Sequence, residues 1–310
     1  MVRGTGILMF FIFTNLKLFA QKDTVQWNKH YVTMTPVVVG AKVDASAFIQ
    51  KIQNDSSFYK AFKNLRILGY TAINDIRMLD KKGGNKGFLH SKTMQHRQQH
   101  CRTMEVIEEQ HGGDIYDDKG RFNYYTAAMY ASLFFTSGKV CNENNIVTNE
   151  GFTADGLSGI DKHKIQLKKL FFNPGQRIEG LPMISGKTAI FEDRLLDKYD
   201  LVIDQEIFQG KECLVFYQKV NPAFKDEVVI DEMKTWFDAT SNEVLARNYS
   251  LSYEAGLYDF NVRMEVEMTH ANGWLVPSLI RYVGDWKVMF KKRERGVFTA
   301  TLFNFNTGDH

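Results

Sequence analysis

The sequence predicts an α+β protein, in which a curved, mostly antiparallel half-barrel sheet has helices packed on its concave face or closing it. Alternating apolar and polar residues over the last hundred positions favour antiparallel strands with one buried face. Aromatic residues make up 13% of the chain against only 5 Pro, a bias typical of strands and apolar interiors. Two segments of the first half have helical spacing. The chain has 310 residues, enough to bury a large core.

The first twenty residues are expected to be a cleavable secretory signal. Arg3 gives a positive start, residues 7–13 are an unbroken apolar run, and Ala20 is a small residue before the cut. An apolar run of about seven residues is too short for a membrane core, which needs about 20. We therefore expect a periplasmic or extracellular protein. No cysteine stands near the cut, so no lipid anchor is expected there. The alternative for the apolar run is a buried N-terminal strand.

The charge balance gives no support for nucleic-acid binding. Lys and Arg number 39 and Asp and Glu 36. Arg3 and Lys17 belong to the expected signal, so the remainder has a net charge near +1. A nearly neutral chain lacks the basic surface that phosphate backbones attract.

A helical segment is expected to begin after Asp44. Asp44 is a suitable N-cap, and residues 55–57 can break the segment into two shorter helices. Apolar residues recur after Asp44 at helical spacing and define one face. These residues are Phe48, Ile52, Tyr59 and Phe62.

A hairpin and a buried helix are predicted next. Residues 65–79 and 86–97 pair around a turn at 81–85, and residues 104–109 form another strand. Residues 124–135, which are nearly all apolar, predict a helix buried on most sides. A polar, glycine-rich stretch within 143–160 is the expected subdomain junction of an otherwise single domain spanning residues 21–310.

The second half is predicted to be a series of strands. Residues 163–172 alternate weakly, and residues 201–208 pair with 212–220 across Gln209-Gly210. A further strand covers 233–237. The clearest alternation lies in the last three strands, which form a meander with one apolar and one polar face, at residues 260–268, 280–290 and 297–305.

The apolar face of this final meander is the candidate ligand-binding surface. Its residues are soft and partly aromatic, which suits either a packed core or a cavity for an apolar ligand. The candidate lining residues are Met264, Val266, Met268, Tyr282, Trp286, Val288 and Phe290.

No motif predicts catalysis, a metal or a cofactor. The glycines of 180–188 miss the spacing of a phosphate loop. His96 and His100 on one strand would lie about 13 Å apart, too far for a shared zinc ion. The carboxylate pairs of Asp204 with Glu206 and of Glu265 with Glu267 fit the wet face of strands better than a glycosidase site.

The three cysteines favour one disulfide in an exported protein. Cys101 and Cys141 lie in the same half of the chain and are the favoured pair, the alternative being that all three thiols are free. Cys213 lies alone in a predicted strand and is expected to be a core residue.

From residue 180 onward the pattern resembles the LolA/LppX-like lipoprotein carriers of Gram-negative bacteria. The matching features are Leu181-Pro182 with Gly186, the strands at 199–208 and 213–220, the strand–turn–strand unit of 235–244, and Trp274-Leu275-Val276-Pro277 before the closing strands. Together they cover roughly 40% of the chain and consist of short motifs. The resemblance implies a curved sheet closed by helices around a hydrophobic cavity.

The leading functional hypothesis is an exported, non-catalytic envelope protein that binds a lipid or a lipoprotein acyl chain. An outer-membrane or envelope protein is the expected macromolecular partner. The first alternative is an envelope scaffold with a fully packed core, and the second is a hydrolase-type enzyme. A carrier requires an apolar cavity large enough for an acyl chain, whereas a scaffold has that space filled by side chains.

Overall fold

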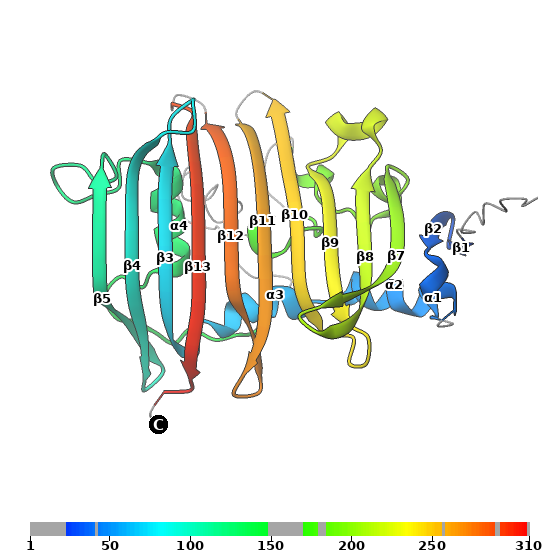
Figure 1. The fold of residues 1–310 in the computed structure, drawn as a ribbon, viewed down its shortest axis with the longest axis horizontal. Helices are drawn as coiled ribbons and strands as arrows, with labels where there is room; N and C mark the ends of the chain where they lie inside the picture. The colour runs from blue at the N-terminus through cyan, green and yellow to red at the C-terminus, as the bar shows by residue number, and fades with distance from the viewer. Residues whose placement is uncertain are drawn as a thin grey trace, which may run out of the picture.

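The computed structural model describes residues 23–40, 43–147, 170–178, 184–255, 258–288 and 292–308. The expected signal segment, residues 1–20, lies outside these ranges, as does most of the expected junction within 143–160. The described strands form one sheet in the order β1-β2-β7-β8-β9-β10-β11-β12-β13-β3-β4-β5-β6 (Figure 1). The sheet is curved and open, with helices on one face, and the predicted α+β half-barrel is confirmed.

All neighbouring strands pair antiparallel except β2 and β7, which are parallel. The strand bounds are β1 Asp23–Trp27, β2 His30–Met34, β3 Gly69–Leu79, β4 Asn85–Gln98, β5 Cys101–Gly113, β6 Val140–Cys141, β7 Tyr199–Phe208, β8 Lys211–Val220, β9 Ile230–Asp238, β10 Val244–Ala255, β11 Tyr258–Ala271, β12 Trp274–Val288 and β13 Glu294–Asn306.

The hairpins predicted from turn residues are confirmed. β3 and β4 pair around the turn at residues 80–84, β7 and β8 pair around Gln209 and Gly210, and β11 to β13 form the final meander. Both Gln209 and Gly210 have positive φ, at 49° and 78°. Such a two-residue turn matches the right-handed twist of the flanking strands. Strand β13 then pairs with β3, so the last strand joins the two halves of the sheet.

The helices are α1 Pro36–Gly40, α2 Ala45–Asn54, α3 Ser57–Asn64, α4 Tyr125–Phe134 and α6 Asp193–Leu196, with 3₁₀ turns η1 Ser185–Lys187 and η2 Pro222–Glu227. Asp44 caps α2 as predicted, because its carboxylate accepts a hydrogen bond from the Ala47 N–H at 3.0 Å. The predicted break at residues 55–57 separates α2 from α3. Among the described helices none is long and apolar enough to cross a membrane.

We call the side of the sheet that carries α2, α3 and α4 the helix-covered face. In Figure 1 these three helices lie behind the strands, with α2 and α3 crossing the strands from β7 towards β12 and α4 behind β3. The main hydrophobic core lies between them and the sheet. The opposite, open face carries most of the charged strand residues, which is the division that the alternation predicted.

The strand predicted from the weak alternation of residues 163–172 is wrong at the end that the structure describes. Leu170, Phe171 and Phe172 are helical, and the first two are both buried. Adjacent side chains of a strand point to opposite faces, so a one-sided strand cannot bury two in succession. The strand predicted from residue 65 also begins later, at Gly69, because residues 65–68 form the turn that follows α3.

Candidate functional site

Five of the seven residues expected to line a ligand cavity are buried under other side chains. Met264, Val266 and Met268 lie on β11, and Tyr282 and Trp286 on β12, none more than 6% exposed. Val288 ends β12, where it pairs with Tyr258; its side chain and all of Phe290 lie outside the described structure. A role of these seven residues in ligand binding stays a prediction.

Aromatic contacts fill most of this part of the helix-covered face. The Trp286 ring stacks on Phe260 at 4.6 Å between centroids, and Phe171 contacts Trp286 edge-on at 5.8 Å. A cavity of only about 20 Å³ is found beside Met264 and Tyr282, between the sheet, α4 and Phe172. That volume suffices for about one water molecule. The described residues therefore pack this surface as core.

Helix α4 is held over the sheet by a carboxylate on β13. Glu294 accepts hydrogen bonds from the backbone N–H groups of Tyr125 and Thr126, at 2.9 and 2.8 Å, and from the Thr126 hydroxyl at 2.7 Å. These N–H groups belong to the first turn of α4, where helix geometry leaves them without intrahelical acceptors. Of the ten residues of α4 only Ala128 and Ser132 are exposed.

Replacing Glu294 with alanine is expected to lower the free energy of unfolding by about 2 kcal/mol, because two N–H groups and a hydroxyl lose an ionised acceptor. Chemical denaturation of E294A and wild type measures the difference. E265A, which removes an exposed carboxylate paired with Arg281 on the open face, is the control and should change little. Equal losses in the two variants would contradict the capping role.

An open groove runs along the helix-covered face at the far end of the sheet. It has a volume of about 570 Å³ and lies over β4 and β5, beside the segment that follows α4. Val106, on β5, faces into the groove with 54% of its surface exposed. The lining residues are Ser91, Thr93, Met104, Val106, Glu109, His111, Tyr116, Asp117, Gly120, Phe122, Phe135 and Thr136.

The groove has an apolar wall and a polar floor whose groups are paired. Met104, Val106 and Phe135 supply apolar surface. On the floor, the buried Asn74 amide donates to the hydroxyls of Ser91 and Thr93, at 3.4 and 3.3 Å. Because these buried polar groups already have partners, the floor presents few unsatisfied hydrogen-bond donors or acceptors to a ligand.

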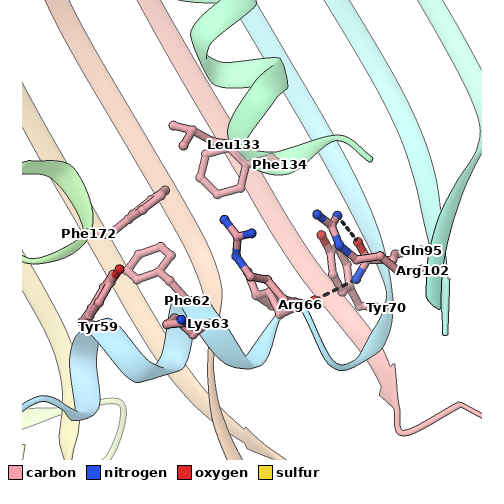
Figure 2. Close-up of a pocket in the computed structure, with 11 residues that line it drawn as sticks. Tyr59, Phe62, Lys63, Arg66, Tyr70, Gln95, Arg102, Leu133, Phe134 and Phe172 are labelled. Carbon is pink, nitrogen blue, oxygen red and sulfur yellow. Dashed lines mark hydrogen bonds between the residues drawn. The ribbon is translucent and has the colours of Figure 1, made fainter. Parts of the chain in front are cut away.

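A smaller pocket of about 40 Å³ lies between α3 and the end of α4 (Figure 2). One side is aromatic and the other is basic. Figure 2 shows Arg66 lying between the aromatic group and the Arg102–Gln95 pair. The lining residues are Tyr59, Phe62, Lys63, Leu65, Arg66, Tyr70, Gln95, Arg102, Leu133, Phe134 and Phe172.

A wall of three hydrogen-bonded side chains forms the boundary that this pocket shares with the groove. The Thr136 hydroxyl donates to the Gln95 side-chain oxygen at 2.9 Å, and Arg102 donates to both residues. The Gln95 amide group in turn donates to the carbonyl oxygens of Leu65 and Leu68, each at 2.7 Å. Gln95 is 1% exposed, so these bonds fix the turn after α3 against β4. Gln95 and Arg102 line the pocket and Thr136 lines the groove, so the two cavities are neighbours across these hydrogen bonds.

Sequence reasoning missed this wall and the groove beside it. The signal that was present is the polar run Ser91, Thr93 and Gln95, which occupies alternate positions of β4 on the face where Leu89 is buried. Polar residues at core-facing positions of a strand are informative because burial requires each of them to find a partner. The basic residues come from α3, β4 and β5, and only the fold brings them together.

The other candidate chemistry of the sequence is dispersed. His96 contacts Glu105 at 3.0 Å, while His100 lies in the turn after β4 with a φ of 62°. Asp204 accepts from the Thr35 hydroxyl, whereas Glu206 accepts from Lys234 and Trp236. Within the described ranges no group of three or more His, Cys, Asp or Glu side chains is placed to hold a metal ion.

A disulfide joins Cys101 of β5 to Cys141 of β6. It fixes the segment after α4 to the edge of the sheet, two residues before Glu143. Cys213 is a buried free thiol on β8, and burial raises its pKa.

Similar solved structures are found across most of the described fold. A LolA superfamily protein from Nitrosomonas europaea is 10% identical and has a TM-score of 0.25, covering 82% of this chain and 93% of its own. An outer membrane lipoprotein-sorting protein domain from Vibrio parahaemolyticus is 9% identical at a TM-score of 0.26, covering 84% and 90%. A DUF1329 family protein from Desulfovibrio piger is 10% identical at 0.25, covering 81% and 93%.

The similar structures therefore include a protein of the LolA superfamily, the class that the sequence pattern resembles. No protein-family model matches the sequence, and the search of curated proteins gives no match.

Proposed function

We propose that this chain is an exported, non-catalytic protein that binds a hydrophobic ligand, a lipid or a lipoprotein acyl chain, in the groove over β4 and β5. The observation that carries the proposal is the volume of that groove, about 570 Å³. Ligand pockets have volumes of roughly 300–1,000 Å³. The groove thus has room for an acyl chain, whereas the cavity beside Tyr282 does not.

The chemistry of the groove supports an apolar occupant. Val106 leaves half of its aliphatic surface open on the helix-covered face, next to Met104 and Phe135. Covering this surface with a hydrocarbon chain removes apolar area from water at about 25 cal/mol per Å². The flexible Met104 side chain can also adapt to chains of different shape.

The scaffold alternative is favoured by a different observation. The apolar face of β11 and β12, where the sequence predicted a cavity, is filled by Phe171 and its aromatic neighbours. A binding role therefore depends on the groove at the β4–β5 end. If the groove binds nothing, the packed core leaves an envelope scaffold as the better account.

Filling the groove tests the proposal. Val106→Trp puts a large side chain into the opening without disturbing a packed position, because Val106 is already half exposed. We expect the affinity for 1-palmitoylglycerol, measured by native mass spectrometry and by titration, to fall at least about tenfold, the loss of roughly two buried CH₂ groups.

Val283→Trp is the matched control, since Val283 is 52% exposed on β12 and alternates with the buried Tyr282 towards the open face. It should bind as wild type does. Undetectable binding of 1-palmitoylglycerol to the wild-type protein, or equal affinity in V106W and wild type, would remove the groove from consideration.

A further inference from the structure

Four basic side chains converge beside the pocket of Figure 2 with a single carboxylate among them. Lys63 and Arg66, from α3 and the turn after it, and Arg102, from β5, line this pocket. Arg97, from β4, lies beside them and donates to the Arg66 carbonyl oxygen. Glu143 is the one described carboxylate that pairs with this group, which we call the basic cluster. The cluster is therefore left with a local excess of positive charge.

We propose that the basic cluster binds the anionic headgroup, a phosphate or carboxylate, of the amphiphile whose acyl chain occupies the groove, and that Glu143 fills this subsite when no ligand is bound. The inference rests on the proposed function for the binding of the ligand's acyl chain in the groove. The headgroup subsite stands on separate residues, so the two can fail separately.

The geometry around Glu143 is that of an anion-binding site. Its two carboxylate oxygens are held by different guanidinium groups, Oε1 by Arg66 and Oε2 by Arg102 at 2.5 Å. The Arg102 side chain is 15% exposed and that of Glu143 20%, so solvent screens the interaction little. Guanidinium groups in fixed positions bind carboxylate and phosphate oxygens especially well.

In the described part of the chain the remaining cations have no such partner. Lys63 makes no ion pair among the described residues, and Arg97 donates only to the Arg66 carbonyl oxygen at 3.4 Å. Burial, together with the neighbouring Arg66 charge, lowers the pKa of Lys63. Burial lowers the pKa of Arg97, and the Glu143 charge opposes this shift without cancelling it. An incoming anion would offset the desolvation of these two cations, which Glu143 alone does not.

Glu143 is ionised when it occupies the subsite. Burial by itself raises the pKa of this carboxyl, but the hydrogen bond from Arg102 and the Arg66 charge outweigh burial and hold the pKa below its usual value. It therefore competes with a ligand anion at neutral pH for the same guanidinium groups.

The surroundings connect the subsite to a hydrocarbon chain. Phe62 stacks on Phe172 at 4.4 Å, and both line the pocket beside Arg66. On the other side, Arg102 donates a hydrogen bond to the hydroxyl of Thr136, which lines the groove. A ligand with its anion at the basic cluster thus has apolar surface directly next to it.

The matched probes are 1-palmitoylglycerol and 1-palmitoylglycerol 3-phosphate, which differ by one phosphate group. We expect the wild-type protein to bind the phosphate at least about tenfold more tightly. In E143Q the affinity ratio between the two probes should rise about fivefold or more, because the internal competitor has lost its charge. In K63M the ratio should fall by a similar factor. E265Q, the same substitution on the open face, should leave the ratio unchanged.

A ratio near one in the wild-type protein, or a ratio that E143Q and K63M do not move, would overturn the headgroup subsite while leaving the groove intact. If neither palmitoyl probe binds, the groove proposal fails, and glycerol 3-phosphate decides the subsite on its own. Saturable binding of glycerol 3-phosphate that K63M weakens would then support a site for soluble phosphates. Its absence would overturn the subsite as well.

Discussion

Replacing Cys101 and Cys141 together with serine is expected to lower the free energy of unfolding by about 4 kcal/mol. The two cysteines are 40 residues apart in sequence, and their bond removes the loop-closure entropy of that segment from the unfolded chain. For a protein of this size the loss corresponds to a fall in Tm of about 8 °C. A bond of this kind also fits an oxidising compartment, which supports the proposed export.

Thermal and chemical unfolding of the double variant, with and without a reductant, measures the effect. C213A is the control, because it removes the third thiol and keeps the disulfide. Its Tm should still fall when reductant is added, and that of the double variant should not. Burial raises the pKa of the Cys213 thiol, so this group should react slowly with alkylating reagents in the folded protein. Two or three rapidly alkylated thiols in the untreated native protein would contradict the disulfide.

Trp286→Ala is expected to cost about 4 kcal/mol of unfolding free energy, the second large effect. Trp286 is 2% exposed, stacks on Phe260 and meets Phe171 edge-on, and its indole N–H donates to the Tyr282 hydroxyl. Removing the ring leaves a cavity and an unpartnered buried hydroxyl. This prediction follows from the packed state of the β11–β12 surface.

Urea denaturation of W286A beside V283A provides the measurement. Val283 lies three residues earlier on the same strand and is 52% exposed, so V283A should change the free energy of unfolding by less than about 0.5 kcal/mol. A cost for W286A of less than about 1 kcal/mol would mean that the ring lines an open space instead of a core.

Most of the strands could be read from the sequence because an antiparallel sheet with one buried face imposes strict alternation. Residues 260–268 show this pattern most clearly, and they lie inside β11. Turn residues such as Gln209-Gly210 and the Asp44 N-cap marked where strands and helices begin or end, because turn and cap preferences depend on only a few neighbouring residues. Local patterns failed at residues 163–172, whose described end is a helical segment that buries Leu170 and Phe171 together.

The candidate site was much less accessible from the sequence. Alternation showed that β11 and β12 have an apolar face, but not whether other side chains fill it. That depends on Phe171, which reaches Trp286 from a segment more than one hundred residues away. The groove over β4 and β5 was missed because it is defined by the lack of covering side chains beside Val106 among the described residues.

By itself the sequence determined the class of the fold, the pairing of the β3–β4 and β7–β8 hairpins, and the polar and apolar faces of the final meander. These properties depend on residues two to four positions apart, so short stretches of the sequence suffice to predict them. The tertiary structure alone decided which apolar surface is packed and which is open. It also brought Lys63, Arg66, Arg97 and Arg102 around Glu143. Such arrangements follow from the pairing of β13 with β3 and from the seating of α4 on Glu294, contacts that join residues more than 160 positions apart.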